Sequence, residues 1–194
     1  MILKAVKRRI RKILGIKAKH GSETTKVRPL VLGYCEGFGC DIGFGGDKIK
    51  KESCIGIDFA TPYAFAADDK VDFACNVGKE PIPVESNYFD YVYSSHLIED
   101  FEDTAGVLSE FIRILKSGGN LILVFPDQQE YEKVCRQTGQ PLNTYHVHSN
   151  MGFTYMMNCL EGLKAKQHFG MELLYKSDRA IDYNVVMVLK ITKG

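Results

Sequence analysis

Residues 40–60, CDIGFGGDKIKKESCIGIDFA, decide the fold of this 194-residue chain. They hold two short apolar runs, each of which ends in a special residue. The first run ends at Ile42 and opens into glycines, and the second, 55–57, ends on Asp58. Each run is typical of a buried parallel strand, and the C-terminal ends of such strands carry functional residues.

Glycines at 43, 45 and 46 let the chain turn sharply after the first run and let a ligand approach the bare backbone. The carboxylate of Asp58 can accept hydrogen bonds from both hydroxyls of a ribose. An ordinary tight turn is the alternative for the glycines alone. Their pairing with an acidic strand end within about twenty residues is more specific, and it predicts an adenosine-binding site.

Two other nucleotide motifs are missing. The dinucleotide pattern G-x-G-x-x-G fails because its third glycine would fall on Lys48, and there is no G-x-x-x-x-G-K-[ST]. The chain also lacks a Tyr-x-x-x-Lys pair. A nicotinamide-dependent reductase or epimerase is therefore the weaker alternative, and a cofactor-binding domain without catalysis is another.

Further motifs follow along the chain: NYFDYVYSSHLIE at 87–99, EFIRILK at 110–116 and SGGNLILVFP at 117–126. Together with DIGFGG and GID, they resemble class I S-adenosylmethionine-dependent methyltransferases of the methyltransferase type 11 domain family, over most of the chain. Asp100 and Ser117 stand where that family often has His and Pro, and neither replaces a cofactor contact. The resemblance implies an enzyme that uses S-adenosylmethionine.

The resemblance and the strand ends together give the expected cofactor-binding residues. Phe59 follows the ribose acid and is placed to stack on adenine, and the family contacts adenine just after its third strand. Packing in a loop or in the core is the alternative for these residues. The full set is Asp41, Gly43, Phe44, Gly45, Asp58, Phe59, Asn76, Val77 and Ser94.

The alternation of strand and helix patterns predicts an α/β fold with a doubly wound, mostly parallel sheet. The resemblance implies that this is a seven-stranded Rossmann-like sheet with an antiparallel last strand, which the hairpin pattern at the end of the chain matches. Strands are expected at 40–42, 55–58, 71–75, 89–94, 121–125, 171–175 and 183–191. Helices are expected at 29–37 over the cofactor pocket, at 48–52, at 103–116 and at 153–167. A long polar segment, 127–151, is expected to contact substrate at the C-terminal edge of the sheet.

Three histidines are candidate catalytic bases. His96 follows the fourth strand, and His146 and His148 alternate within the long polar segment, so that both would face one way in an extended chain. A hydroxyl acceptor needs a base that titrates near neutrality, and histidine fits. A helix entry for His96 and a surface loop for the other two are the alternatives.

The acceptor is expected to be a small molecule or a glycan. Small proteins of this type with a basic N-terminal helix resemble those found beside surface-polysaccharide enzymes, which favours a sugar hydroxyl over quinone-like metabolites. The six cysteines form no C-x-x-C and follow no secretory signal, which indicates reduced thiols in the cytoplasm. Zinc at Cys35 and Cys40 is a weak alternative, and no metal is expected.

The charge of the chain is divided unevenly, although its net value is only +1. The first twenty residues hold eight Lys or Arg and no acid, with apolar residues at three- and four-residue spacing. We interpret 1–22 as a basic amphipathic helix and hinge, and 23–194 as the methyltransferase domain. The helix either packs on the domain or contacts an anionic membrane surface peripherally. Nucleic acid is not an expected partner.

Overall fold

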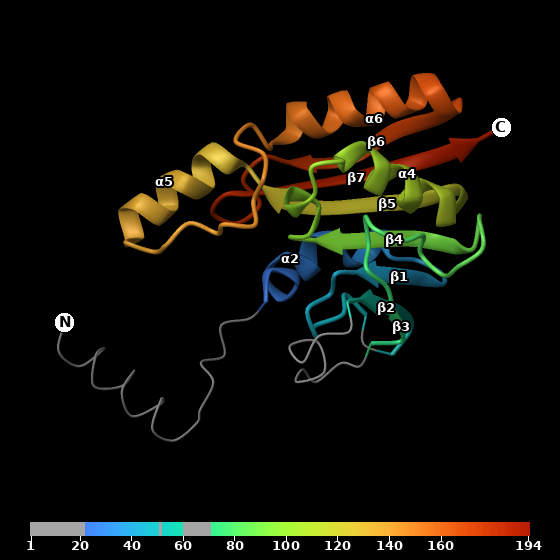
Figure 1. Ribbon diagram of the computed structural model, residues 1–194. Helices are drawn as coiled ribbons and strands as arrows, with labels where there is room; N and C mark the ends of the chain where they lie inside the picture. Colours follow the sequence, from blue (N-terminus) through green and yellow to red (C-terminus); the bar gives the residue numbers. More distant parts are fainter. Residues whose placement is uncertain (1–21, 51, 60–70) are drawn as a thin grey trace.

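The computed structural model describes residues 22–50, 52–59 and 71–194 (Figure 1). Seven strands form one sheet in the order β3-β2-β1-β4-β5-β7-β6. The first five run parallel, and β7 is antiparallel to both β5 and β6. The predicted sheet is confirmed. Its strands are β1 Gly39–Ile42, β2 Cys54–Asp58, β3 Phe73–Ala74, β4 Phe89–Ser95, β5 Leu115–Pro126, β6 Phe169–Ser177 and β7 Asn184–Lys193.

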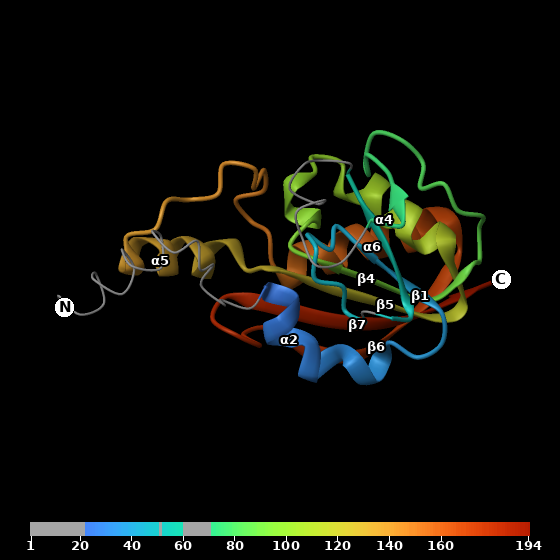
Figure 2. The same cartoon turned by 90° about the horizontal axis from the view of Figure 1, so that it is seen from below.

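Helices cover both faces of the sheet (Figure 2). Helices α4 (Thr104–Ile114) and α6 (Phe153–Gln167) lie on one face, and α2 (Glu23–Val31) with the short helix η1 (Leu32–Tyr34) lies on the other. Alternate residues of a strand point to opposite faces, so β7 sends Val185 and Met187 to the first core and Val186 and Val188 to the second. Both cores are therefore built on the same central strands.

Helix α2 begins earlier than predicted. Ser22 caps it, because its hydroxyl accepts the N–H of Thr25 at 3.0 Å, and Val27 and Val31 are fully buried against the sheet. The expected helix at 29–37 is wrong in its bounds, since Pro29 lies inside α2. The hinge predicted before the domain ends at Ser22.

The short helix predicted at 48–52 is wrong, because residues 43–50 and 52–53 contain no helix. The stretch between β1 and β2, residues 43–53, is only at the lower limit of about 10–12 residues for a crossover that includes a helix. Arg28 of α2 holds this stretch instead. Its guanidinium donates to the Asp47 carboxylate at 2.6 Å and to the carbonyls of Lys48 and Ile49 at 2.9 and 3.1 Å.

Helix α4 passes directly into β5. Asp103 caps the helix, with its carboxylate accepting the N–H of Gly106 at 2.8 Å. The helix ends at Ile114, two residues before the expected end, and β5 starts at Leu115. Gly118 lies inside β5.

The polar segment 127–151 contains a helix that we did not predict, α5 (Gln128–Thr138). Asp127 caps its first turn, and Gly139 ends it in the left-handed conformation at φ 69°. Both cap residues and the spacing of the buried Tyr131 and Cys135 are standard helix signals. Figure 1 shows α5 beyond the end of the sheet to which β4 and β5 point.

The proposed zinc pair is separated by the sheet. Cys35 belongs to the core under α2, whereas Cys40 belongs to the core under α4 and α6. The six cysteines are all free thiols, and five of them are buried.

The basic segment 1–21 lies outside the described residues, so its surface attachment stays a prediction. None of the described helices is long and apolar enough to cross a membrane.

Candidate active site

The turn after β1 needs glycine for two different reasons. Gly43 has φ 71°, and a Cβ placed on it would lie 2.7 Å from a methyl carbon of Leu97. Gly45 has φ 56°, and a Cβ there would meet nothing within 4 Å. The first glycine permits close packing against the loop after β4, and the second leaves bare backbone facing open space.

Asp58, at the end of β2, faces this turn. Its Oδ2 accepts the N–H of Gly45 at 2.9 Å and its Oδ1 accepts the N–H of Phe59 at 2.7 Å. A carboxylate offers about four lone-pair positions, so each oxygen retains capacity for a ligand hydroxyl. The two segments singled out in the sequence therefore form one hydrogen-bonded unit.

A cavity of about 400 Å³ opens over this unit. Its volume lies in the range of small-molecule sites, roughly 300–1,000 Å³. It is bordered by the start of α2, the turn after β1, and the ends of β2 and β4. The lining residues are Ser22, Glu23, Thr24, Gly43, Phe44, Gly45, Asp58, Ser95, His96 and Leu97.

Asp41 lies beneath the cavity and does not border it. It is fully buried, and its Oδ2 accepts the N–H of Ile49 at 2.7 Å. Its Oδ1 has no hydrogen-bond partner among the described residues, and burial raises the pKa of this carboxyl well above its usual range. We therefore reassign Asp41 from cofactor contact to support of the glycine turn.

Ser94 also has a structural role. Its hydroxyl donates to the carbonyl of Ile42 at 3.0 Å, which ties β4 to β1. Because neighbouring residues of a strand face opposite sides, the serine that borders the cavity is Ser95. The expected strand end was one residue too early, and that error selected the wrong serine.

The three residues expected to contact adenine differ in how available their side chains are to a ligand. Val77 is buried in the core under α4, so its side chain packs there and does not reach the cavity. The backbone N–H of Asn76 donates to the Glu80 carboxylate at 2.5 Å. Phe59 is 51% exposed beside Asp58, which leaves its ring available for stacking on a ligand.

His96 borders the same cavity as Asp58. Its Nδ1 lies 3.1 Å from Oε1 of Glu99, and its Nε2 lies 3.0 Å from Oδ1 of Asn184. The amide of Asn184 in turn donates to Glu23 at 2.8 Å. Burial alone would lower the pKa of His96, but the bond to Glu99 and the charges of Glu99 and Glu23 raise it above its usual value.

His146 lies on the other side of Glu99. Its Nε2 is 3.8 Å from Oε1 of Glu99, whose side chain is only 2% exposed. Its Nδ1 is 2.9 Å from Oε1 of Gln128, and the amide nitrogen of Gln128 donates to Glu132 at 3.1 Å. This orientation of the amide makes Nδ1 the donor. Burial lowers the pKa of His146, against the charge of Glu99, and so favours the neutral form of this ring.

Aromatic rings surround the two histidines. The rings of Tyr131 and His146 are 4.7 Å apart, those of Tyr131 and Tyr183 are 5.1 Å apart, and Tyr183 meets His96 edge-on at 6.2 Å. Tyr131, Tyr183 and His146 do not border the cavity, so these rings pack the two histidines in place.

His148 is not part of this cluster, and we exclude it as a candidate base. Its Nε2 lies 2.7 Å from the carbonyl of Phe101 and 3.0 Å from the hydroxyl of Thr104, and its ring packs on Tyr155 at 4.8 Å. Turns at 144–145 and 149–150 flank the two histidines, and the two rings bond to different partners. His148 therefore fixes this segment to α4 and α6.

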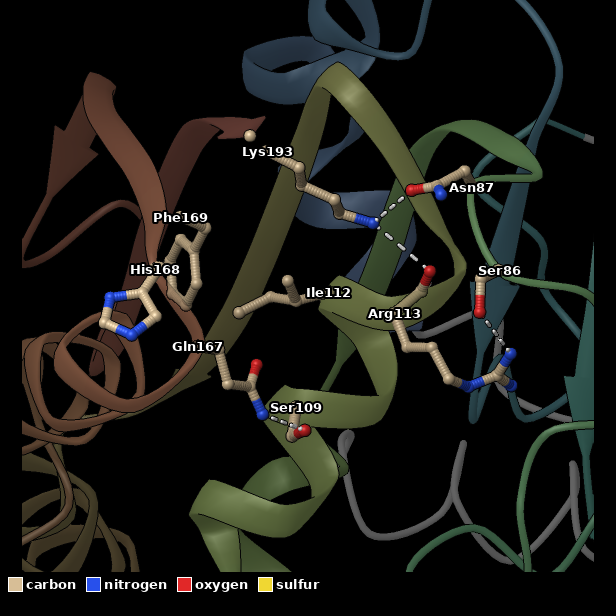
Figure 3. Close-up of a pocket in the computed structure, with 10 residues that line it drawn as sticks. Ser86, Asn87, Ser109, Ile112, Arg113, Gln167, His168, Phe169 and Lys193 are labelled. Atoms are coloured by element: carbon tan, nitrogen blue, oxygen red, sulfur yellow. Dashed lines mark hydrogen bonds between the residues drawn. The ribbon is translucent and has the colours of Figure 1, made fainter.

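A larger hollow of about 680 Å³ lies at the opposite end of the sheet (Figure 3). Its two cations already have partners. Lys193 donates to Asn87 at 2.7 Å and to the carbonyl of Arg113 at 3.2 Å, and the Arg113 guanidinium pairs with Glu110 at 2.7 Å. These bonds connect the end of β7 to the end of α4, so we give this hollow a structural role.

No cluster of three or more metal-ligating side chains occurs in the described part of the chain. The site is therefore described by its carboxylates, histidines and exposed backbone.

One family model matches part of the chain. Residues 32–123 match the methyltransferase domain model of the methyltransferase type 11 family. No curated protein matches the chain.

Solved structures share the fold at low identity. The PH0226 protein of Pyrococcus horikoshii is 16% identical, with a TM-score of 0.66 over 90% of this chain and 92% of its own. YcgJ of Bacillus subtilis is 15% identical, with a TM-score of 0.62 over 88% and 99%. A SAM-dependent methyltransferase of Archaeoglobus fulgidus is 14% identical, with a TM-score of 0.62 over 87% and 95%.

Proposed function

We propose that this chain is a class I S-adenosylmethionine-dependent methyltransferase of the family that its residues 32–123 match, and that it methylates a hydroxyl of a small molecule or sugar. The family match favours methyl transfer over the reductase or epimerase. Two parts of the cavity support the same choice: the cofactor half, around Gly45 and Asp58, and the acceptor half, around His96.

The cofactor half suits an adenosine derivative. Gly45 leaves the backbone open to the cavity, and Asp58 has lone pairs free for two ribose hydroxyls. Ser22, Glu23 and Thr24 complete the rim from α2. Asp58 would hold the ribose, and Glu23 brings a carboxylate that suits the sulfonium charge of S-adenosylmethionine.

The observation that carries the proposal is the position of His96. Its ring borders the same cavity as Gly45 and Asp58, and it is hydrogen-bonded to the buried carboxylate of Glu99. A histidine with a carboxylate on one nitrogen can accept a proton on the other. His96 is therefore our candidate base for an acceptor hydroxyl.

A sugar fits the surroundings of His96 better than an apolar acceptor. The cavity that His96 borders is lined by the polar side chains of Ser22, Glu23, Thr24, Asp58 and Ser95, and Tyr183 meets the His96 ring edge-on. Sugars present both C–H faces and hydroxyls, and a site built to bond hydroxyls discriminates strongly against ligands that lack them. The same reasoning applies to other hydroxylated small molecules, which we keep among the candidate acceptors.

The cofactor supplies an activated methyl group: a lone pair of the acceptor oxygen forms the new O–C bond while the S–C pair stays on sulfur as a neutral thioether. The protein has to align the acceptor, exclude water and take one proton. Nε2 of His96 takes the hydroxyl proton in this scheme.

The test is transfer of a labelled methyl group. Purified full-length protein is incubated with methyl-deuterated S-adenosylmethionine and a panel of free sugars, nucleotide sugars, phenols and primary amines, and products are read by mass spectrometry. We expect label on oxygen of a hydroxylated acceptor. Label on amine nitrogen alone, or no transfer from a cofactor that calorimetry shows to be bound, would overturn the proposal.

A further inference from the structure

Both ring nitrogens of His96 face hydrogen-bond acceptors. Oε1 of Glu99 lies 3.1 Å from Nδ1, and Oδ1 of Asn184 lies 3.0 Å from Nε2. The orientation of the Asn184 amide is fixed because its nitrogen donates to Glu23 at 2.8 Å. An imidazole that donates from both nitrogens is an imidazolium, which cannot act as a base.

We propose that His96 is an imidazolium in the cofactor-free enzyme and loses its Nε2 proton to solvent when the cationic cofactor enters the cavity, so that the base forms only in the loaded enzyme. This inference rests on the proposed function, and it concerns how the candidate base is controlled. It explains why a base would be held in its protonated form beside an open cavity.

The charges around His96 come from each element packed against it. Glu23 on α2 and Glu99 and Asp100 on the short helix η2 (Ile98–Asp100) are acidic, and Tyr183 and His146, in its favoured neutral form, add no positive charge. These acids stabilise one cation near the ring. A second cation in the same cavity competes with the imidazolium for them, and like charges at such distances favour the neutral form of the weaker one.

Glu23 provides the contact through which this competition acts. Its carboxylate borders the cavity, and it lies 4.0 Å from Nε2 of His96 as well as bonding to Asn184. A cationic ligand that takes this carboxylate frees the Asn184 amide to turn. The amide nitrogen can then donate to the bare Nε2 of His96, which stabilises the neutral ring.

The proton count closes over one turnover. His96 releases one proton to solvent as the cofactor binds, and it regains one from the acceptor hydroxyl during transfer. The product left in the cavity is a neutral thioether, so the imidazolium again has no competing cation. The net release of one proton is the release that methylation of a hydroxyl by a sulfonium requires.

Calorimetry with two cofactor forms tests this inference. S-adenosylmethionine and S-adenosylhomocysteine share the ammonium and carboxylate, and only the first carries the sulfonium charge. Each is titrated into the full chain in two buffers of different ionisation enthalpy at about pH 6.5, where an ordinary histidine is half protonated. We expect at least roughly half a proton released per S-adenosylmethionine and close to none for S-adenosylhomocysteine.

The chain offers a matched pair of variants. His96 and His168 both have positive φ, at 52° and 54°, and asparagine tolerates that conformation. His96→Asn should abolish the difference in proton release, whereas His168→Asn, at the far end of the sheet, should preserve it. Glu23→Gln should reduce it, and it serves as a second variant should His96→Asn fold poorly.

The outcomes separate this inference from the proposed function. Equal proton release with the two ligands, or a difference that persists in His96→Asn, overturns the inference while cofactor binding stands. Absence of binding heat for both ligands contradicts the proposed function itself. Nitrogen chemical shifts of the His96 ring in wild-type protein give an independent reading, and a neutral ring without cofactor at about pH 6.5 would also overturn the inference.

Discussion

The two halves of the cavity are built from different parts of the protein. In the cofactor half, Asp58 is held by backbone N–H groups of Gly45 and Phe59, and the segments involved lie within one β–turn–β unit. In the acceptor half, His96 and Glu99 are held by side chains from α2, β7 and the segment after α5.

This difference determines how far a substitution acts. Among the described residues, Asp58 is held only by backbone N–H groups, so replacing it should remove its contact with the ligand and leave the other side chains of the site in place. A histidine in a chain of side-chain hydrogen bonds has its protonation set by several partners, so changing one partner alters the others. Four substitutions, taken from the largest expected effect to the smallest, test this contrast.

His96→Asn should give the largest effect. Loss of a positioned base lowers kcat by about 10²–10⁴-fold, while the affinity for S-adenosylmethionine changes little because Asp58 and the glycine turn are intact. Initial-rate kinetics on the acceptor and calorimetry on the cofactor measure the two quantities. His168→Asn is the control, and an unchanged kcat in His96→Asn would remove His96 from the mechanism.

Asp58→Ala should affect the cofactor half alone. Loss of charged hydrogen bonds to the ribose costs about 1.5–3 kcal/mol, or roughly 10–150-fold in cofactor affinity. Asp90→Asn is the control, because Asp90 also accepts a backbone N–H, that of Phe38 at 2.8 Å, but at the start of β4. Calorimetric affinities that are equal for Asp58→Ala and wild type would refute the ribose assignment.

Glu99→Gln should change the pH dependence of the acceptor half. Glu99 raises the pKa of His96, so removing its charge lowers that pKa, and the acid limb of the kcat/KM profile moves to lower pH. The ratio of activity in mild acid to activity at the optimum should rise several-fold. The exposed Glu102→Gln serves as control, and an acid limb that stays in place would show that Glu99 does not act through His96.

Asp100→Asn should have the smallest effect, and on stability. Burial and the neighbouring charge of Glu99 raise the pKa of Asp100 to about 6. The folded state then holds a proton that the unfolded state lacks between this value and the ordinary one, so stability falls as pH rises through that window.

Asp100→Asn removes this loss of stability at higher pH. At about pH 7.5 the free energy of unfolding should rise by about 1 kcal/mol, which is less than the shift alone would give because water reaches part of the side chain. At about pH 4 the gain should vanish. Urea denaturation at both values measures it, and a gain that is equal at the two would contradict the assigned protonation.

The cofactor half could be predicted from sequence because its geometry is local. The glycine turn and Asp58 are separated by one short connection, so their spacing alone indicates that they meet. The serine was misassigned by a one-residue error in the end of β4, because such an error exchanges the two faces of a strand. Asp41 was misassigned because only the packing shows that it is fully buried.

The acceptor half could be predicted only as residue types. Histidines were expected near the strand ends, but the separation of His146 from His148 depends on contacts with Glu99 and with Thr104. Glu23 and Asn184, which set the state of His96, lie 161 residues apart in sequence and showed no motif. Helix α5 carried ordinary cap signals at Asp127 and Gly139, so that omission was avoidable.

The docking of α2 has a consequence for where the folding unit begins. The family match starts at residue 32, yet Val27 and Val31 fill the core above Tyr91 and Tyr93, and Arg28 holds the stretch after β1. A fragment cut at the edge of the match would expose one apolar face of the central strands to solvent and to other copies. Expression boundaries for this protein belong before Ser22. A chain that lacks α2 would aggregate through the apolar surface that α2 normally covers.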